Sequence, residues 1–281
     1  MELVLNAADV ELDRDYILVL AHAFVANEQY DEAFQLIKNI YDMSYLALVE
    51  RKLLTRVVKA GKTVKDKEGY ENMLNELIES LSDNLRSQLH TMLVLAQTYQ
   101  ETGEHEKADK LIRKTGFITE DAWLVLGPFD NSGGIGYNTQ YITENLPMID
   151  TTKEYEGKNG KVRWQKTKNI SLLGDIRLGK ESEWTVAYTF ATIHSPEERE
   201  VEFRFDSDDQ GKIWVNGIDV FTHTKTFTAE IDNFKFPVKL NAGLNSVLVK
   251  VCQETGGWGF YLRITDKDGN TYDDLDFMKV E

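Results

Sequence analysis

Hydrophobic and polar positions follow one period in the first part of the chain and another period in the rest. Through about Gly116, small and apolar residues recur at spacings of three, four and six, as they do along one face of a helix. A first run has these residues at Leu20, Ala21, Phe24, Tyr30, Ala33 and Ile37, and a second run at Leu95, Ala96, Tyr99, Gly103, Ala108 and Ile112. Each run predicts two helices that meet in a hairpin.

The two helical runs share small and aromatic residues at a constant offset of 75 residues, namely Ala21 and Ala96, Phe24 and Tyr99, and Ala33 and Ala108. This pattern resembles the tetratricopeptide family, whose period of about 34 residues leaves room for a degenerate repeat with a longer connection in between. The polar stretch 59–69 predicts that connection. The usual tryptophan and proline of the family are missing, so a generic array of helical hairpins is the alternative. Arrays of this kind hold ligands, usually peptides, on a concave face.

From Ala122 the period changes to two. Val201, Phe203 and Phe205 alternate with Glu202 and Arg204, which predicts a half-buried antiparallel strand. The same alternation returns at 184–190, 234–240, 247–251 and 260–264. Turn sequences rich in Asn, Asp and Gly separate these segments, as is typical of a β-sandwich or jelly roll. Pro237 stands among polar-facing residues and therefore predicts an edge strand.

The chain is expected to be an α+β protein with two domains. Its 281 residues suffice for two separate cores. The first domain, residues 1–116, is predicted to be all-α with tetratricopeptide-like hairpins. The second, residues 117–281, is predicted to be an antiparallel β-sandwich.

The stretch 205–217, FDSDDQGKIWVNG, combines three aspartates with a hairpin signal. Asn216-Gly217 predicts a two-residue type I′ turn, with Ile213 and Val215 toward the core and Trp214 on the other face. The aspartates suggest the calcium loop of helix-loop-helix proteins at first sight. That interpretation fails, because the twelfth loop position is a glycine and the flanking segments are strands.

The same stretch resembles the hallmark of protective-antigen-type and galactose-binding-like sandwiches, which are appended to many secreted carbohydrate-active enzymes. The segments 123–131, 240–253 and 256–264 fit the second group in order and spacing. In some lectin-like relatives two adjacent aspartates bind a calcium ion that holds sugar hydroxyls, and Asp208 and Asp209 match that pair. The resemblance therefore implies a candidate Ca²⁺ site at Asp206, Asp208 and Asp209. The alternative is turn chemistry, in which aspartates bond to nearby backbone amides.

Two tryptophans are candidates for stacking on a sugar ring, since an aromatic face can cover the apolar side of a pyranose. Trp214 faces away from the predicted core, and Trp258 stands in a glycine-rich stretch. Asn216, Tyr261 and Arg263 are further candidate ligand residues beside them. The alternative for both tryptophans is packing in the core or between the domains, and their exposure on one shared surface would decide between the two.

Composition and motifs exclude several classes of function. The net charge of −15 argues against a nucleic-acid partner and against docking on anionic lipid. A single cysteine, Cys252, excludes an internal disulfide. No apolar run is long enough to predict a membrane span. The five histidines are scattered, and no nucleophile elbow or metal motif predicts an enzyme.

The sequence thus predicts a non-catalytic binding module for carbohydrate or a cell-surface glycan. We expect it to derive from a larger exported protein, with an extracellular or periplasmic location, although no signal peptide opens this chain. The alternative is a protein-interaction scaffold in which the helical repeats bind a peptide or partner protein.

Overall fold

The computed structural model describes residues 14–42, 57, 60–61, 63–118, 122–167, 176–177 and 183–280. The chain divides into two compact units, residues 1–111 and 112–281. The structure is α+β, as the change of period predicts. The division falls five residues before the predicted boundary at Gly116, because Arg113, Thr115 and Phe117 contact residues of the β-rich unit.

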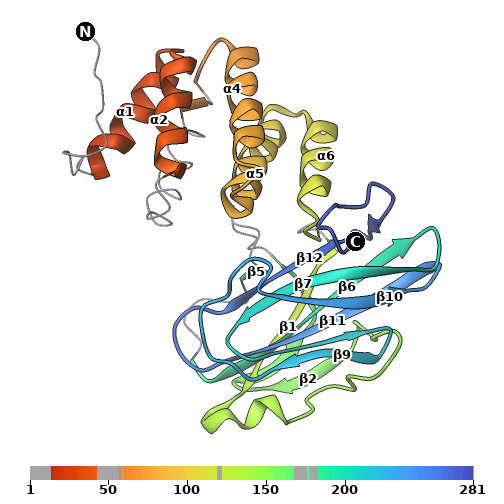
Figure 1. Cartoon of the computed structure of the whole chain (residues 1–281). Helices are drawn as coiled ribbons and strands as arrows, with labels where there is room; N and C mark the ends of the chain where they lie inside the picture. Colours follow the sequence, from red (N-terminus) through yellow and green to blue (C-terminus); the bar gives the residue numbers. More distant parts are fainter. Residues whose placement is uncertain are drawn as a thin grey trace. The chain divides into compact units, whose positions relative to one another are not determined.

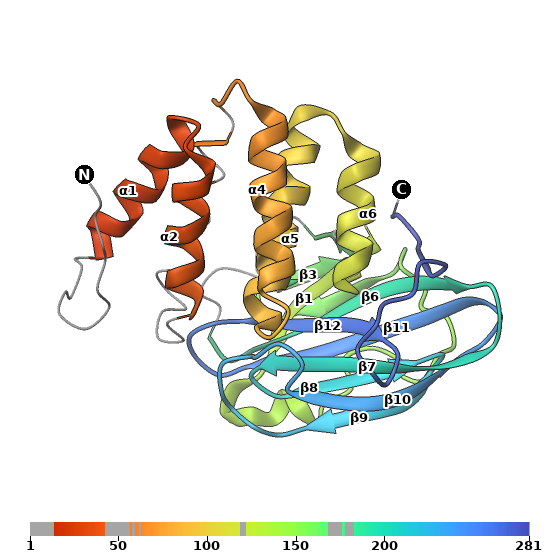
Figure 2. The same cartoon turned by 45° about the horizontal axis from the view of Figure 1, so that its top comes forward.

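The first unit consists of helices that lie side by side in chain order (Figures 1 and 2). Their bounds are α1 Arg14–Ala26, α2 Tyr30–Asp42, α4 Lys67–Ser80 and α5 Leu85–Thr102, and α6, His105–Thr115, spans the division. The small residues of the shared pattern are all buried, namely Ala21, Ala33, Ala96 and Ala108. These alanines therefore lie where the sequence predicts inward-facing helix positions.

Caps explain where the helices begin and end. The Asp66 side chain accepts a hydrogen bond from the Gly69 amide and starts α4, so the last residues of the predicted 59–69 connection are helical. Asn84 caps α5 in the same way. Gly103 ends α5 with a left-handed φ of 84°, a conformation that glycine adopts without steric cost. Lys59 and Lys62 of the predicted connection, and most of the predicted middle repeat, lie outside the described residues.

The second unit contains antiparallel sheets. The order in the larger, seven-stranded sheet is β4-β1-β6-β11-β8-β9, with β13 also paired to β6. Its strands are β1 Leu124–Asp130, β4 Gln165–Lys166, β6 Thr185–Ser195, β8 Gly211–Val215, β9 Ile218–His223, β11 Gly243–Gln253 and β13 Asp276–Phe277. The four-stranded sheet has the order β10-β7-β12-β5, with β5 Ile176–Arg177, β7 Arg199–Asp208, β10 Phe234–Leu240 and β12 Gly259–Thr265. A hairpin of β2, Glu154–Gly157, and β3, Gly160–Arg163, is separate, and Figure 2 shows the layered strands.

Strand parity places the core between the two large sheets. Ile213 and Val215 of β8 join this inner core, together with alternate residues of β6, β7, β10, β11 and β12. The predicted two-residue turn between β8 and β9 is confirmed, since Asn216 and Gly217 have φ values of 53° and 78°. The edge position predicted for Pro237 is also confirmed, because β10 ends the four-stranded sheet.

A second apolar cluster covers the other face of the seven-stranded sheet. Strand residues of opposite parity form it, including Leu126, Tyr188, Trp214 and Leu248. Ile142, Ile149 and Trp164, from the segment that joins β1 to β4, pack on top of them. The face that the alternation marks as outer is therefore buried.

Candidate functional site

The stretch Asp206–Gln210, here called the aspartate turn, contains the last three residues of β7 and leads into β8. Two of its three carboxylates bond to backbone amides. Asp206 is fully buried and accepts hydrogen bonds from the amides of Ser207 and Glu230 at 2.9 and 2.8 Å, and from Asn233 Nδ2 at 3.0 Å. Asp209 accepts from the Glu254 amide at 2.8 Å. These bonds hold the turn against two neighbouring loops.

Asp208 differs from the other two aspartates of the turn. It is half-buried, and no hydrogen bond to its carboxylate is found among the described residues. Burial, followed by the nearby charges of Asp209 and Asp206, raises the pKa of Asp208 to about 6. Gly257 leaves the space that this carboxylate occupies, since a Cβ there would lie 2.5 Å from Asp208 Oδ2. Asp208 is therefore a partly accessible acceptor whose charge is disfavoured by its surroundings.

A serine and a histidine lie beneath the turn. Ser207 Oγ donates to the Asp209 carbonyl at 2.7 Å, so it accepts from His223 Nε2 at 2.8 Å. This assignment leaves His223 Nδ1 unprotonated, and it is buried without a hydrogen-bond partner. Burial and the charge of Lys225 lower the pKa of His223 to about 4. Ser207 is fully buried, so the pair is closed to a substrate.

The expected calcium site is not formed by these residues. Within the described ranges, no three His, Cys, Asp or Glu side chains are grouped so that they could hold a metal ion. The physical reason is that Asp206 and Asp209 direct their carboxylates to different backbone amides. The turn chemistry that the sequence offered as the alternative accounts for both.

The expected stacking role of the tryptophans is also corrected. Trp214 is 6% exposed in the outer cluster, and Trp258 is 8% exposed in the core between the sheets, where its Nε1 donates to the Val251 carbonyl. The two rings lie on opposite faces of the seven-stranded sheet and share no surface. Parity placed Trp214 on the correct face, but the segment that covers that face leaves no ring surface for a sugar.

The other three expected ligand residues serve internal contacts. Asn216 Nδ2 donates to Asn245 Oδ1, and Asn216 exchanges hydrogen bonds with the backbone of Ser246, which fixes the β8–β9 turn to β11. Tyr261 is buried, with its ring 6.4 Å from that of Phe117. Arg263 is buried and belongs to an ion-pair network, so Tyr261 and Arg263 are closed to a ligand, whereas Asn216 is half-buried.

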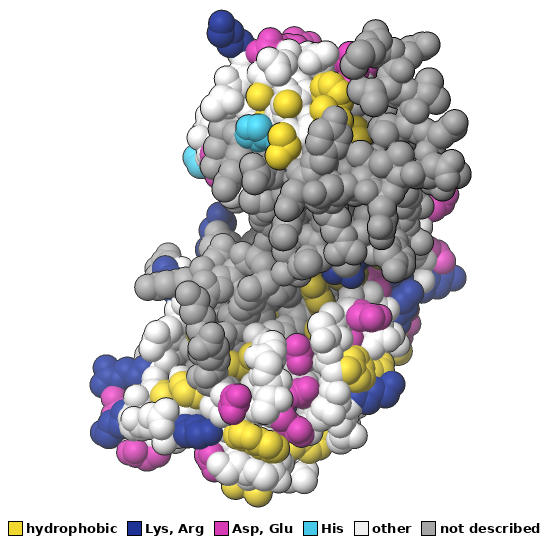
Figure 3. Space-filling view, turned by 90° about the vertical axis from the view of Figure 1, so that its left-hand side faces the viewer, with side chains coloured by type: hydrophobic (Ala, Val, Ile, Leu, Met, Phe, Trp, Pro, Cys, Tyr) yellow, Lys and Arg dark blue, Asp and Glu magenta, His cyan; other side chains and the backbone are white. Residues whose placement is uncertain are grey.

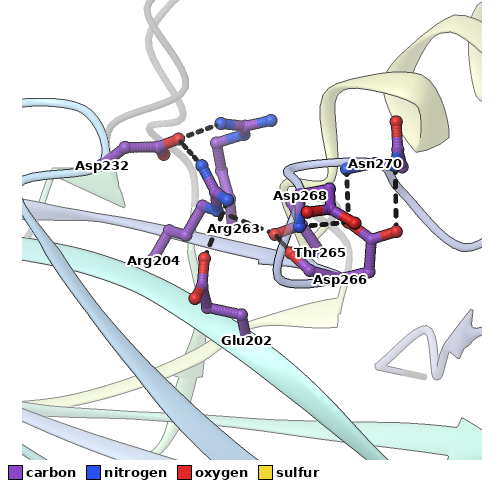
Figure 4. A network of polar contacts seen from close by, with 8 residues as sticks. All are labelled: Glu202, Arg204, Asp232, Arg263, Thr265, Asp266, Asp268 and Asn270. Atoms are coloured by element: carbon purple, nitrogen blue, oxygen red, sulfur yellow. Dashed lines mark hydrogen bonds and ion pairs between the residues drawn. The ribbon is translucent and has the colours of Figure 1, made fainter.

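That network centres on Asp232 (Figure 4). Asp232 Oδ2 accepts from Arg263 at 2.6 Å and from Arg204 at 3.0 Å, while Oδ1 is buried without a hydrogen-bond partner. Arg204 also bonds to Thr265 and pairs with Glu202. Arg263 Nε donates to the Thr115 carbonyl at 2.6 Å, which caps the C-terminal end of α6. The arrangement fixes Asp232 on the four-stranded sheet.

Sequence reasoning missed a buried lysine in β11. Lys250 is 1% exposed, and its Nζ donates to the carbonyls of Tyr137 and Thr139 and to Glu144 Oε1. Glu144 accepts a second bond, from the Tyr188 hydroxyl at 2.6 Å. The signal was a lysine inside the otherwise apolar VLVKV run, which alternation alone assigns to solvent. Three acceptors around Nζ match the three protons of an ammonium group, so this cluster fastens the covering segment and has no free nucleophile.

Among the helices of the described part of the chain, none combines the length and apolar character needed to cross a membrane. No protein-family model matches the chain, and no curated protein is similar to it.

Several solved structures share a weak similarity with it. An anti-sigma factor domain-containing protein from Clostridium clariflavum is 14% identical, with a TM-score of 0.33 over 54% of this chain and 46% of that chain. A β-glucosidase from Kluyveromyces marxianus in complex with glucose is 14% identical, with a TM-score of 0.30 over 54% and 16%. A putative β-galactosidase from Bacteroides fragilis is 13% identical, with a TM-score of 0.25 over 53% and 23%. The chain spans less than half the length of each, and similarity at this level assigns no function.

Proposed function

We propose that the β-rich unit is a non-catalytic binding module for carbohydrate, with a galactose-binding-like sandwich. The proposed contact surface is Asp208 together with the neighbouring loop 254–257, in place of the tryptophans that the sequence suggested. One observation carries the proposal. Asp208 is the aspartate of the turn that accepts no described hydrogen bond, and it stays partly accessible beside Gly257.

The chemistry of Asp208 suits a ligand rich in hydroxyl groups. A carboxylate offers only acceptors, and sugar hydroxyls are donors that satisfy them. The charge of Asp208 is disfavoured by burial and by its two acidic neighbours, so a donor supplied by a ligand stabilises it. Burial of the backbone-bonded Asp206 and Asp209 keeps the surrounding turn in place before any ligand binds.

The test is binding of the full chain to a polysaccharide panel, by affinity electrophoresis and then calorimetry on any ligand that is retained. We expect Asp208→Asn to weaken binding by at least about tenfold, the effect of losing one hydrogen bond to a charged group. The matched control is Asp268→Asn, in an exposed turn whose described contact is made by the backbone amide. Retention of no polysaccharide, or equal binding by Asp208→Asn, would contradict the proposal.

We infer that the first unit is tetratricopeptide-like, and its surface favours a protein partner as a second candidate function. Helix α1 is rich in apolar residues, and its Val19 is 56% exposed. Figure 3 shows hydrophobic side chains gathered beside a histidine on the helical unit. A chain that binds no polysaccharide would leave this peptide-binding role as the favoured one.

A further inference from the structure

The loop between β9 and β10, residues 224–233, has no regular structure, and contacts near its two ends hold it. Most of its residues are exposed or half-buried. At its C-terminal end Asp232 pairs with two buried arginines, Arg204 and Arg263. The Glu230 amide and the Asn233 side chain both donate to Asp206. Because segments with few buried apolar contacts open locally at low cost, these contacts decide whether the loop stays closed.

At its N-terminal end the loop is held by aromatic rings around His223. The Phe227 ring stacks on the His223 ring with centroids 6.3 Å apart, and the Phe234 ring lies 5.0 Å away. Lys225 Nζ lies 5.6 Å from the Phe227 centroid and 5.3 Å from that of Phe234. The Lys225 ammonium group and the His223 imidazole therefore contact the same two rings, those of Phe227 and Phe234.

We propose that loop 224–233 is an acid-released lid, closed while His223 is neutral and opened when His223 takes up a proton. This inference does not rest on the proposed carbohydrate function. Opening removes Asp232 and Asn233 from the sheet and exposes the arginine pair Arg204 and Arg263 together with the Asp206 carboxylate.

The hydrogen bonds around His223 give the reason. Its Nε2 proton already goes to Ser207, whose own proton goes to the Asp209 carbonyl. An added proton must sit on Nδ1, which is buried and has no acceptor. Lys225 of the loop is the charged group that acts on the imidazole, and it repels an imidazolium. Asp206, near the end of β7, and Asp209, in the turn that follows, stand on either side of Ser207 in the sequence, and their carboxylates bond to the amides of Glu230 and Glu254. The closed loop therefore destabilises the imidazolium form of His223.

Linkage fixes the sign and the size of the effect. Closure lowers the pKa of His223 to about 4, whereas an exposed histidine has a pKa of about 6.5. The free energy that favours the closed loop is thus at its full value above pH 6.5, and it decreases as the pH falls toward 4. Each pH unit within that window raises the opening equilibrium about tenfold, so the total change approaches about 300-fold.

Hydrogen–deuterium exchange of the full chain between pH 7 and pH 4 tests the lid, after correction for the intrinsic pH dependence of amide exchange. The reporter is the Glu230 amide, which donates to Asp206 in the closed loop. We expect its protection to fall steeply below pH 6.5, while the amides of β11 in the core stay protected. An unchanged Glu230 protection factor, or simultaneous loss of protection in β11, overturns the proposal.

Two variants remove the proton-binding group in different ways. His223→Phe keeps an aromatic ring against Phe227, and His223→Gln keeps a donor toward Ser207. We expect either folded variant to lose most of the pH dependence of Glu230 protection across this window, even if its level is uniformly lower, and burial of Asp206, which raises the pKa of that acceptor, accounts for the remainder. His194→Phe, a histidine of β6 outside this cluster, is the matched control and should keep the wild-type pH dependence. A wild-type pH dependence in the His223 variants contradicts the assignment to His223.

Discussion

The folded protein disfavours the charged form of Asp208, and no described donor forms a hydrogen bond to its carboxylate. The residue identity could be predicted as special from the sequence, because three aspartates cluster before a hairpin. That Asp208 lacks the amide donors that Asp206 and Asp209 have could not be predicted. That distinction depends on which backbone amides lie within reach, and the amides of Glu230 and Glu254 come from loops 24 and 45 residues away in the chain.

The same imbalance predicts that Asp208→Asn stabilises the protein at neutral pH. The pKa of Asp208 is raised to about 6 in the folded state, so the folded protein holds a proton that the unfolded chain releases near pH 4. The resulting loss of stability is complete above pH 6 and absent below about pH 4. With screening of a half-buried group, we expect a gain of about 1 to 2 kcal/mol for Asp208→Asn at pH 8 and almost none at pH 4. Urea unfolding at the two pH values checks this, and a variant less stable than wild type at pH 8 would contradict it.

At the scale of elements, period and turn chemistry predicted the strands and the β8–β9 hairpin, because both are local properties of the chain. The position of the segment between β1 and β4 could not be predicted in this way, since that segment has little regular structure of its own. Its residues Ile142, Ile149 and Trp164 cover the outer sheet face and bury Trp214 and Lys250. Parity fixes the face on which a side chain lies, but whether another segment covers that face is a non-local property.

The Lys250–Glu144 pair gives a prediction for this covering segment. Lys250→Met leaves the half-buried Glu144 without its cation, so we expect a loss of about 3 to 5 kcal/mol in the free energy of unfolding. The double variant Lys250→Met/Glu144→Leu removes the unpaired charge as well and should recover most of that loss. Urea unfolding of the two single variants and the double variant forms a complete cycle. Additive effects of the two substitutions would show that the pair is not coupled.

At the scale of the whole molecule, the change of period located the division of the chain to within five residues, and the remaining difference has a specific cause. The sequence places the boundary at Gly116, where the helical pattern ends. In the structure the preceding residues already belong to the β-rich unit, since Thr115 accepts a hydrogen bond from the buried Arg263, and Arg113 donates to the Leu275 carbonyl. A helix boundary and a unit boundary need not coincide when a buried side chain binds the end of the helix.

Two fragments distinguish these boundaries. We expect residues 112–281 to fold alone, because both apolar clusters of the β-rich unit lie within them. Residues 117–281 lack the Thr115 carbonyl, which leaves Arg263 Nε buried without its acceptor and should cost about 1 to 3 kcal/mol. Urea unfolding of both fragments measures the difference. Arg113→Ala in the longer fragment removes a hydrogen bond to the Leu275 carbonyl and an exposed ion pair with Asp276, so it should cost less than the truncation. Equal stability of the two fragments would show that the sequence boundary at Gly116 is the better one.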